Sequence, residues 1–217
     1  MRGKDIKKYG YNFADKYLIA TFPSKKYDIE DYPAVRDYLL NFGKSDVEYL
    51  SQYGKDCWGK KRLEQSGNKG SRKKTHNKWF ELQDSIAYWD DFNKPKIIYP
   101  CIMADEPKFC LDKAGEYFTV APGNIITGKN IEYLLNLLCS NLLYFALRKF
   151  YMGGGIEGEL KTNRLELLPI VIFDESNKIC KKLKDLFTNN NEIDNLVYQL
   201  YGLTKNEIDY IRNSFNC

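Results

Sequence analysis

Apolar positions along this 217-residue chain follow two spacings, one typical of strands and one typical of helices. The clearest strand pattern is at 94–100, where Ile97, Ile98 and Tyr99 form an apolar run between Pro95 and Pro100. Similar short runs predict strands at 17–20, 108–111, 117–120, 124–127 and 164–173. Because several of these runs are joined by short turns, such as the one at 112–115, we expect an antiparallel sheet.

Helical spacing appears at 27–42, at 130–150 and in the C-terminal tail. Residues 27–42 predict a helix with its entry turn, because Pro33 suits a first turn and Gly43 a C-terminal stop. Its apolar face is Tyr32, Val35, Leu39 and Phe42. Residues 130–150 carry a leucine-rich stripe and predict the longest helix of the chain. Since polar residues interrupt that stripe and it is short for a membrane span, we expect a buried or interdomain helix.

The last 44 residues, 174–217, predict two or three short helices. Gly202 is placed to end one of them, and Thr204 to cap the next, three residues before Glu207. The whole pattern predicts an α+β fold: a curled, mostly antiparallel sheet with flanking helices, one long leucine-rich helix and a small C-terminal helical tail. We expect a main domain at 1–173 and the tail at 174–217. A content of 43% hydrophobic and 15% aromatic residues is sufficient for a packed core.

Charge is concentrated in one segment. The chain carries a net charge of +4, but nine lysines and arginines against two acids give Lys55–Lys78 a charge of +7, so the remainder sums to −3. Four glycines and little periodicity predict a long loop at 54–77. A cationic loop followed by Trp79, Phe80 and Trp89 favours a surface that binds a polyanion. A solvated loop next to a core strand is the alternative that the spacing leaves open.

Catalytic motifs give weak signals. Gly123–Lys129 matches the phosphate-loop spacing G-x-x-x-x-G-K, but Asn130 stands where the magnesium-binding Ser or Thr is required. The sequence has no Pro-Asp dipeptide of the common metal-dependent nucleases and no Asn-Pro-Pro-aromatic motif of amino-methylating enzymes. We therefore expect no catalytic residues in this chain, with a nucleotide-binding enzyme using Gly123–Lys129 as an alternative.

Cysteine and histidine spacing does not predict a metal site. The six cysteines form no C-x-x-C pair, and His76 is the only histidine. Scattered cysteines suit a reducing compartment, and the first ten residues lack the apolar core of a secretory signal. We expect a cytoplasmic protein that itself holds no cofactor or metal.

Several segments, in order, resemble those of TaqI-like C-terminal specificity domains. They are RGKDIKKY (2–9), YLI (17–19), IEDYPAVRDYL (29–39), KWFELQ (78–83), KPKIIYP (94–100), IEYLLNLLCSNL (131–142), LLPI (167–170) and EIDNLVYQLYGLTKNEI (192–208). The resemblance implies the target-recognition part of an adenine-specific DNA methyltransferase or of a single-chain type IIG restriction–modification enzyme. Type I specificity subunits have similar recognition domains. In the larger enzymes the methyltransferase, and often the nuclease, lies upstream, so the chain is expected to be a fragment or a separate specificity polypeptide.

This resemblance agrees with the basic segment and implies double-stranded DNA as partner, together with a methyltransferase or nuclease region. S-adenosylmethionine and magnesium would then belong to the parent enzyme. Lysines and arginines would contact phosphates, and Asn77 or Gln83 could read adenine. The contact candidates are Lys60, Lys61, Arg62, Lys69, Arg72, Lys73, Lys74, His76, Asn77, Lys78, Trp79, Gln83, Lys94 and Lys96. A protein-interaction module that binds an acidic partner through the same loop is a further alternative.

Overall fold

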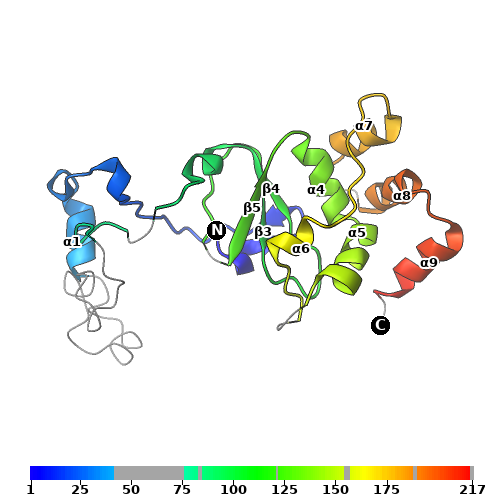
Figure 1. Ribbon diagram of the computed structural model, residues 1–217, viewed down its shortest axis with the longest axis horizontal. Helices are drawn as coiled ribbons and strands as arrows, with labels where there is room; N and C mark the ends of the chain where they lie inside the picture. Colours follow the sequence, from blue (N-terminus) through cyan, green and yellow to red (C-terminus); the bar gives the residue numbers. More distant parts are fainter. Residues whose placement is uncertain (42–75, 83–84, 121, 154–156, 188–189, 216–217) are drawn as a thin grey trace. The chain divides into compact units, whose positions relative to one another are not determined.

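The computed structural model describes residues 1–41, 76–82, 85–120, 122–153, 157–187 and 190–215 (Figure 1). The chain divides into two compact units. Unit 1 combines Met1–Lys16 with Tyr88–Cys217, and unit 2 is Tyr17–Ala87. The helical tail from residue 174 falls within unit 1, and the domain boundary expected at residue 173 stays a prediction.

Unit 1 is built on a three-stranded antiparallel sheet. Its strands are β3 (Lys96–Pro100), β4 (Cys110–Asp112) and β5 (Gly123–Thr127), in the order β4-β3-β5. The central strand β3 is the predicted apolar run, and all five of its residues are buried. Its neighbours are the predicted runs at 108–111 and 124–127, shifted by one or two residues. The expectation of an antiparallel sheet is therefore confirmed.

Both faces of this sheet are covered, because successive side chains of β3 point to opposite sides. Ile97 and Tyr99 belong to the main core that the helices complete. Ile98 packs on the other face with Ile6 and Cys110. Ile6 comes from a small hairpin of β1 (Ile6–Lys7) and β2 (Gly10–Tyr11), preceded by the 3-10 turn η1 (Gly3–Asp5). Two-sided burial explains why β3 is a continuous apolar run rather than an alternating one.

The leucine-rich segment forms two helices instead of the single long one that the spacing predicts. These are α4 (Ile131–Cys139) and α5 (Asn141–Ala146), and a short π-helix, η6 (Leu147–Tyr151), follows. The chain breaks at Ser140, whose backbone is extended (ψ 152°) and whose hydroxyl accepts from the amide of Leu143. The buried carboxylate of Asp194 also accepts from the amide of Asn141, 2.7 Å away. A serine cap and an acid at a new helix N-terminus stabilise the break, so continuous periodicity did not mean a continuous helix.

The apolar run at 164–173 is not a strand, which corrects another expectation. Its start lies in α6 (Thr162–Leu165), and the rest has no regular structure. Tyrosine hydroxyls take the place of a neighbouring strand: Tyr133 donates to the carbonyl of Val171 (2.9 Å), and Tyr201 donates to that of Pro169 (2.9 Å) while accepting from the amide of Val171 (3.2 Å). Because side chains satisfy this backbone, apolar composition alone could not identify its conformation.

Two further predicted strands are wrong. Residues 17–20 have no strand assignment, and Tyr17 is 85% exposed. Residues 117–120 also have no strand assignment, and the central strand β3 is paired on both edges, with β4 and with β5. They are held instead by Met1, whose ammonium donates to the carbonyl of Phe118 and whose carbonyl accepts from the hydroxyl of Thr119 (3.1 Å).

The tail prediction is confirmed. Residues after 173 form α7 (Lys178–Asp185), α8 (Asn190–Leu200) and α9 (Lys205–Asn213). Gly202 has a positive φ of 66° after α8, and Thr204 caps α9 in a capping box with Glu207. These helices pack against α4 and α5, and the buried amide of Asn136 donates to the carbonyls of Leu183 and Leu186 at the end of α7.

Unit 2 contains the 3-10 turns η2 (Pro23–Lys25) and η3 (Ile29–Asp31) and the helix α1 (Pro33–Asn41). Helix α1 begins at Pro33, as the sequence predicts. Gly43 and most of the loop at 54–77 lie outside the described residues. With two small antiparallel sheets and many helices, the α+β class is confirmed. In the described part of the chain, no helix is long and apolar enough to span a bilayer.

Candidate nucleic-acid interface

The fourteen predicted contact residues fall into two groups. Eight lie outside the described residues: Lys60, Lys61, Arg62, Lys69, Arg72, Lys73, Lys74 and Gln83. The other six are His76, Asn77, Lys78, Trp79, Lys94 and Lys96. The first four of these belong to unit 2, and the two lysines at 94 and 96 belong to unit 1. The continuous basic and aromatic stretch therefore crosses from one unit into the other.

In unit 2, the end of the basic segment is a tight turn fixed by its own hydrogen bonds. The amide of Lys78 donates to the carboxylate of Glu81 (2.7 Å), and the amide of Glu81 donates back to the carbonyl of Lys78 (3.0 Å). The side-chain amide of Asn77 donates to the carbonyl of Leu82 (2.7 Å). Thr21 anchors the turn, because its hydroxyl donates to the carbonyl of Phe80 and its carbonyl accepts from the amide of Leu82. The backbone from which His76 and Lys78 project is thus well defined.

Two rings hold this turn against α1. Phe80 is buried with Ile29 and Leu39, and Trp79 is half-buried against the same cluster. The rings of Trp79 and Phe80 meet edge to face, with centroids 5.7 Å apart. The ammonium of Lys78 lies 5.6 Å from the centroid of Phe80, while His76 and Lys78 are exposed. The turn therefore presents two basic side chains to solvent from a packed aromatic base.

In unit 1, Lys94 and Lys96 have opposite environments. The side chain of Lys94 is 59% exposed and lies 2.6 Å from the carboxylate of Asp91. Lys96 is completely buried, its ammonium pairs with the carboxylate of Asp112, and it donates to the carbonyl of Phe92 (2.6 Å). This corrects the assignment of Lys96 as a DNA contact, because its charge is already neutralised inside the protein.

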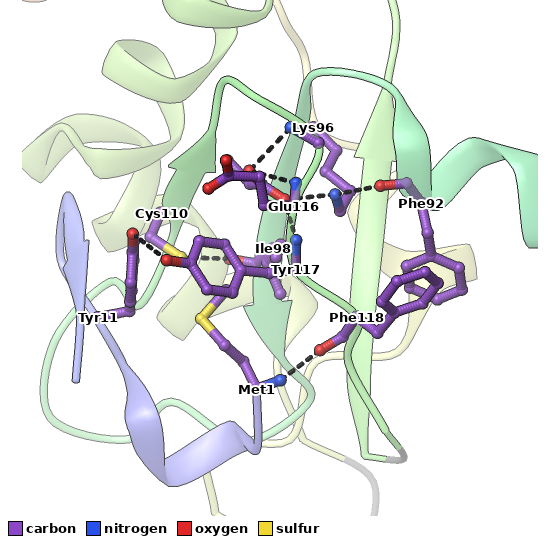
Figure 2. A network of polar contacts seen from close by, with 11 residues as sticks. Met1, Tyr11, Phe92, Lys96, Ile98, Cys110, Glu116, Tyr117 and Phe118 are labelled. Atoms are coloured by element: carbon purple, nitrogen blue, oxygen red, sulfur yellow. Dashed lines mark hydrogen bonds and ion pairs between the residues drawn. The ribbon is translucent and has the colours of Figure 1, made fainter. Parts of the chain in front are cut away.

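Figure 2 shows a network of polar contacts around Lys96. The carboxylate of Asp112, which pairs with Lys96, accepts most of them. One carboxylate oxygen accepts from the amides of Gly115 (3.0 Å) and Glu116 (3.1 Å). The other accepts from the amide of Tyr117 (2.8 Å) as well as from Lys96. A carboxylate that accepts several amides in this way fixes the backbone of a turn. A Cβ at Gly115 would lie 2.4 Å from the carbonyl oxygen of Asn93, so only glycine fits there.

The network positions aromatic side chains from three separate segments. Tyr117 follows the turn directly, and its hydroxyl accepts from that of Tyr11 (3.0 Å) (Figure 2). Phe118 stacks on Trp89, with ring centroids 4.7 Å apart. Trp89 lies in the 3-10 helix η5 (Trp89–Asn93). Because Lys96 holds both Phe92 and Asp112, one buried ammonium ties η5 to the turn after β4. We call these rings, Tyr11, Trp89, Tyr117 and Phe118, the aromatic surface. Lys96 has a structural role beneath it.

Titratable groups near this surface favour their neutral forms. The hydrogen bond to Tyr117, aided by partial burial, raises the pKa of Tyr11 to about 12. Burial raises the pKa of the Cys110 thiol to about 12. At neutral pH the tyrosine therefore remains a hydrogen-bond donor, and the cysteine remains a thiol.

The G-x-x-x-x-G-K spacing does not form a phosphate loop. Gly123–Thr127 is strand β5, and its residues pair with β3 along its length, from Pro100↔Gly123 to Lys96↔Thr127. A strand whose backbone is committed to a ladder cannot wrap a phosphate. Among the residues that the structure describes, no group of three or more His, Cys, Asp or Glu side chains could hold a metal ion. The described cysteines, Cys101, Cys110, Cys139 and Cys180, form no disulfide.

Sequence reasoning missed the role of Asp112 and of the aromatic surface. One signal was present: Asp112 and Gly115 were expected to form a turn, and an Asp at the start of a turn commonly accepts backbone amides. A second signal was a lysine at the start of a strand that is otherwise apolar, since a charge in a buried strand requires a partner. The contact between Tyr11 and Tyr117, 106 residues apart, left no trace in local spacing.

A strongly basic segment such as Lys55–Lys78 is the electrostatic feature that nucleic-acid-binding domains share. The family model of the TaqI-like C-terminal specificity domain matches residues 1–170. The chain therefore belongs to this family, and the resemblance seen in the ordered sequence segments is confirmed. A search of the curated proteins found no match.

Proposed function

We propose that this chain recognises a specific sequence in double-stranded DNA as the specificity domain of a restriction–modification enzyme. The observation that carries the proposal is the family match over residues 1–170. The charge of +7 between Lys55 and Lys78 supports it independently, because DNA affinity depends largely on neutralised phosphates.

In this proposal the two kinds of contact are divided between side chains. Lysines and arginines of the basic segment contact phosphates and set the position of the duplex, and a few polar side chains reach base edges. The exposed side chains of His76 and Lys78 extend the phosphate-binding surface. Because the Asn77 amide already donates to the carbonyl of Leu82, Gln83 is the better candidate for pairing with adenine.

We further propose that catalysis belongs to a separate region of the same or a partner polypeptide. An adenine-specific methyltransferase must bring its target base out of the helix, and a specificity domain would hold the duplex while it does so. S-adenosylmethionine and magnesium would bind to that region, and the assembly would work in the cytoplasm. A fragment of a type I-like specificity subunit is the second candidate, since such subunits have similar recognition domains.

The test is a binding competition among duplexes with randomised sites, measured with the parent chain and with Arg72, Lys73 and Lys74 changed to Ala. The parent should select one sequence, and the basic segment should contribute about −4 to the slope of log affinity against log salt if it contacts about four or five phosphates. Removing three contacts should make the slope shallower by about 2.7. Lys178, Lys181 and Lys205 changed to Ala provide a control, because three exposed lysines are removed from the tail helices.

Three outcomes would contradict the proposal. A triple variant that binds duplexes as well as the parent would remove the basic segment from the interface. Equal affinity for DNA and heparin would favour a module that binds acidic proteins. Binding of ATP that is lost in Lys129→Ala would favour a nucleotide-binding enzyme instead.

A further inference from the structure

A hollow of about 100 Å³ lies in unit 1 outside every contact predicted from the sequence. Its lining consists of Phe145, Arg148, Lys149, Ser214 and Phe215. These residues come from the end of α5, from η6 and from the residues that follow α9. Figure 1 shows α5 and α9 next to each other, and the two helices are in contact.

The buried ring of Tyr144 contacts two residues that line the hollow, Phe215 and Arg148. Tyr144 is buried, and its hydroxyl donates to the carbonyls of Met103 (3.0 Å) and Ala104 (2.9 Å). Its ring stacks on Phe215 with centroids 5.9 Å apart and planes inclined by 8°. The guanidinium carbon of Arg148 lies 6.0 Å from the centroid of the same ring. Arg148 is thus oriented by a ring that the core holds in place.

Among the described residues, the two cations of the hollow have no acidic partner. In the described part of the chain, neither Arg148 nor Lys149 lies within an ion pair, whereas Lys94 pairs with Asp91 and Lys182 pairs with Glu192. The hydroxyl proton of Ser214 is donated to the carbonyl of Ile211 (2.6 Å), so the available donors of the hollow are the two cationic side chains. Both side chains are exposed. A concave site with two adjacent positive charges favours an anion.

Exposed rings border the site. Phe150 is 70% exposed and Tyr210 is 66% exposed. Both rings meet that of Phe145 edge to face, with centroids 6.5 Å and 5.9 Å apart. Exposed aromatic rings next to cations are typical of surfaces that bind nucleic acid, where rings pack on sugars or bases while cations hold phosphates. Protein interfaces also contain such rings, but two cations with no acidic partner in the described part of the chain favour the polyanion.

We infer that this hollow binds a phosphate group of the DNA backbone through Arg148 and Lys149. The inference rests on the proposed function and deepens it, because it places a second contact with the duplex on unit 1, separate from the basic segment of unit 2. Such a contact carries no sequence information and fixes the position of the domain on the duplex.

The experiment compares DNA binding by the parent chain and three variants across a range of salt concentrations. In the first variant both Arg148 and Lys149 are changed to Ala. The second, Arg148→Lys with Lys149→Arg, keeps both charges. The third changes Lys178 and Lys181 to Ala and is the matched control, since it removes two exposed cations from α7. Circular dichroism melting establishes that each variant is folded.

We expect the alanine pair to weaken binding of every duplex about tenfold or more, to a similar extent for preferred and random sequences, and to reduce the salt slope by about two. The charge-preserving pair should retain most of the slope, and the α7 control should match the parent. Inorganic phosphate should compete with duplex for the parent more strongly than chloride does at equal ionic strength, and this excess should disappear in the alanine pair.

Each alternative outcome has a separate meaning. If the alanine pair binds DNA as the α7 control does, the inference is overturned while the proposed function stands. The same holds if the alanine pair keeps its DNA affinity but no longer associates with a methyltransferase region, because the surface would then be a protein interface. If the parent chain itself fails to bind duplex DNA, both the proposed function and the inference are wrong.

Discussion

Lys96 and Lys78 belong to one continuous basic and aromatic stretch of the sequence, yet the fold uses them in opposite ways. Lys96 starts the central strand of unit 1, is completely buried, and pairs with Asp112. Lys78 lies in unit 2, is exposed, and rests against the ring of Phe80. The same residue type is a structural charge in one unit and a solvent-facing cation in the other.

The two regions also differ in the core that supports them. The sheet of unit 1 packs into a large cluster to which α4, α5, α7 and α8 all contribute. The described cluster of unit 2 has three buried residues, Ile29, Leu39 and Phe80, with three more partly buried. A large core can compensate the cost of burying a lysine when the charge is paired, as that of Lys96 is with Asp112. Local charge density therefore does not identify a binding residue unless burial is known.

Lys96→Ala is expected to have the largest effect, and it tests whether the buried lysine is structural. Removing one partner leaves the Asp112 carboxylate buried without its counter-charge, so we expect the free energy of unfolding to fall by about 3–5 kcal/mol. Guanidinium denaturation measures the change. Lys94→Ala is the matched control, since that lysine is exposed, and should leave the free energy of unfolding nearly unchanged. A loss below about 1 kcal/mol for Lys96→Ala would show that the buried pair is not needed.

Two leucine-to-alanine substitutions test the difference between the cores. Leu137→Ala removes a fully buried side chain from unit 1 and should cost about 3–5 kcal/mol, and Leu39→Ala, in the smaller cluster of unit 2, should cost about 2 kcal/mol. Amide hydrogen exchange should show that Leu39→Ala accelerates exchange in α1 and leaves α4 protected. Equal loss of protection in α4 would mean that the two units unfold together.

Lys78→Ala and Lys94→Ala compare the two exposed lysines in DNA binding. Among the described residues the ammonium of Lys78 lies against the ring of Phe80, whereas that of Lys94 pairs with Asp91, so the loss of Lys78 should weaken binding more. We expect a cost of about 1 kcal/mol for Lys78→Ala and a decrease of about 0.9 in the salt slope. Fluorescence anisotropy at several salt concentrations measures both. Indistinguishable variants would remove the turn at 76–82 from the interface.

Acid stability tests the ion pair between the partly exposed Arg2 and the buried Asp5 in unit 1. Two hydrogen bonds from the Arg2 guanidinium (2.8 and 2.9 Å) lower the pKa of Asp5 to about 2. Because this folded-state pKa is below the unfolded value of about 3.9, the stabilisation is present above pH 4 and is lost as the pH falls toward 2.

In Arg2→Ala, stability should therefore decline less between pH 4 and pH 2. We expect a small difference between the two profiles, since the arginine side chain is 38% exposed and solvent screens the pair. Urea midpoints measured at pH 5, 3 and 2 provide the comparison. Parallel pH profiles of the two proteins would rule out this contribution.

Several elements of the fold followed from local spacing. The run at 94–100, the helix beginning at Pro33 and the Thr204–Glu207 cap all depend on neighbouring residues, and all three are confirmed. The failures share one cause. Ser140 breaks a periodic helix with help from Asp194, and residues 169–171 are satisfied by Tyr133 and Tyr201, which are distant in sequence. Local patterns do not contain partners from elsewhere in the chain.

The candidate site shows the same division. The concentration of positive charge, the aromatic residues beside it and the family likeness are all properties of residue order, and the sequence determined them by itself. Only the tertiary structure decided that Lys96 is an internal counter-charge, that Tyr11 meets Tyr117, and that Arg148 and Lys149 border a hollow with Phe215. The physical reason is that burial and pairing free energies depend on which distant segments the fold brings together.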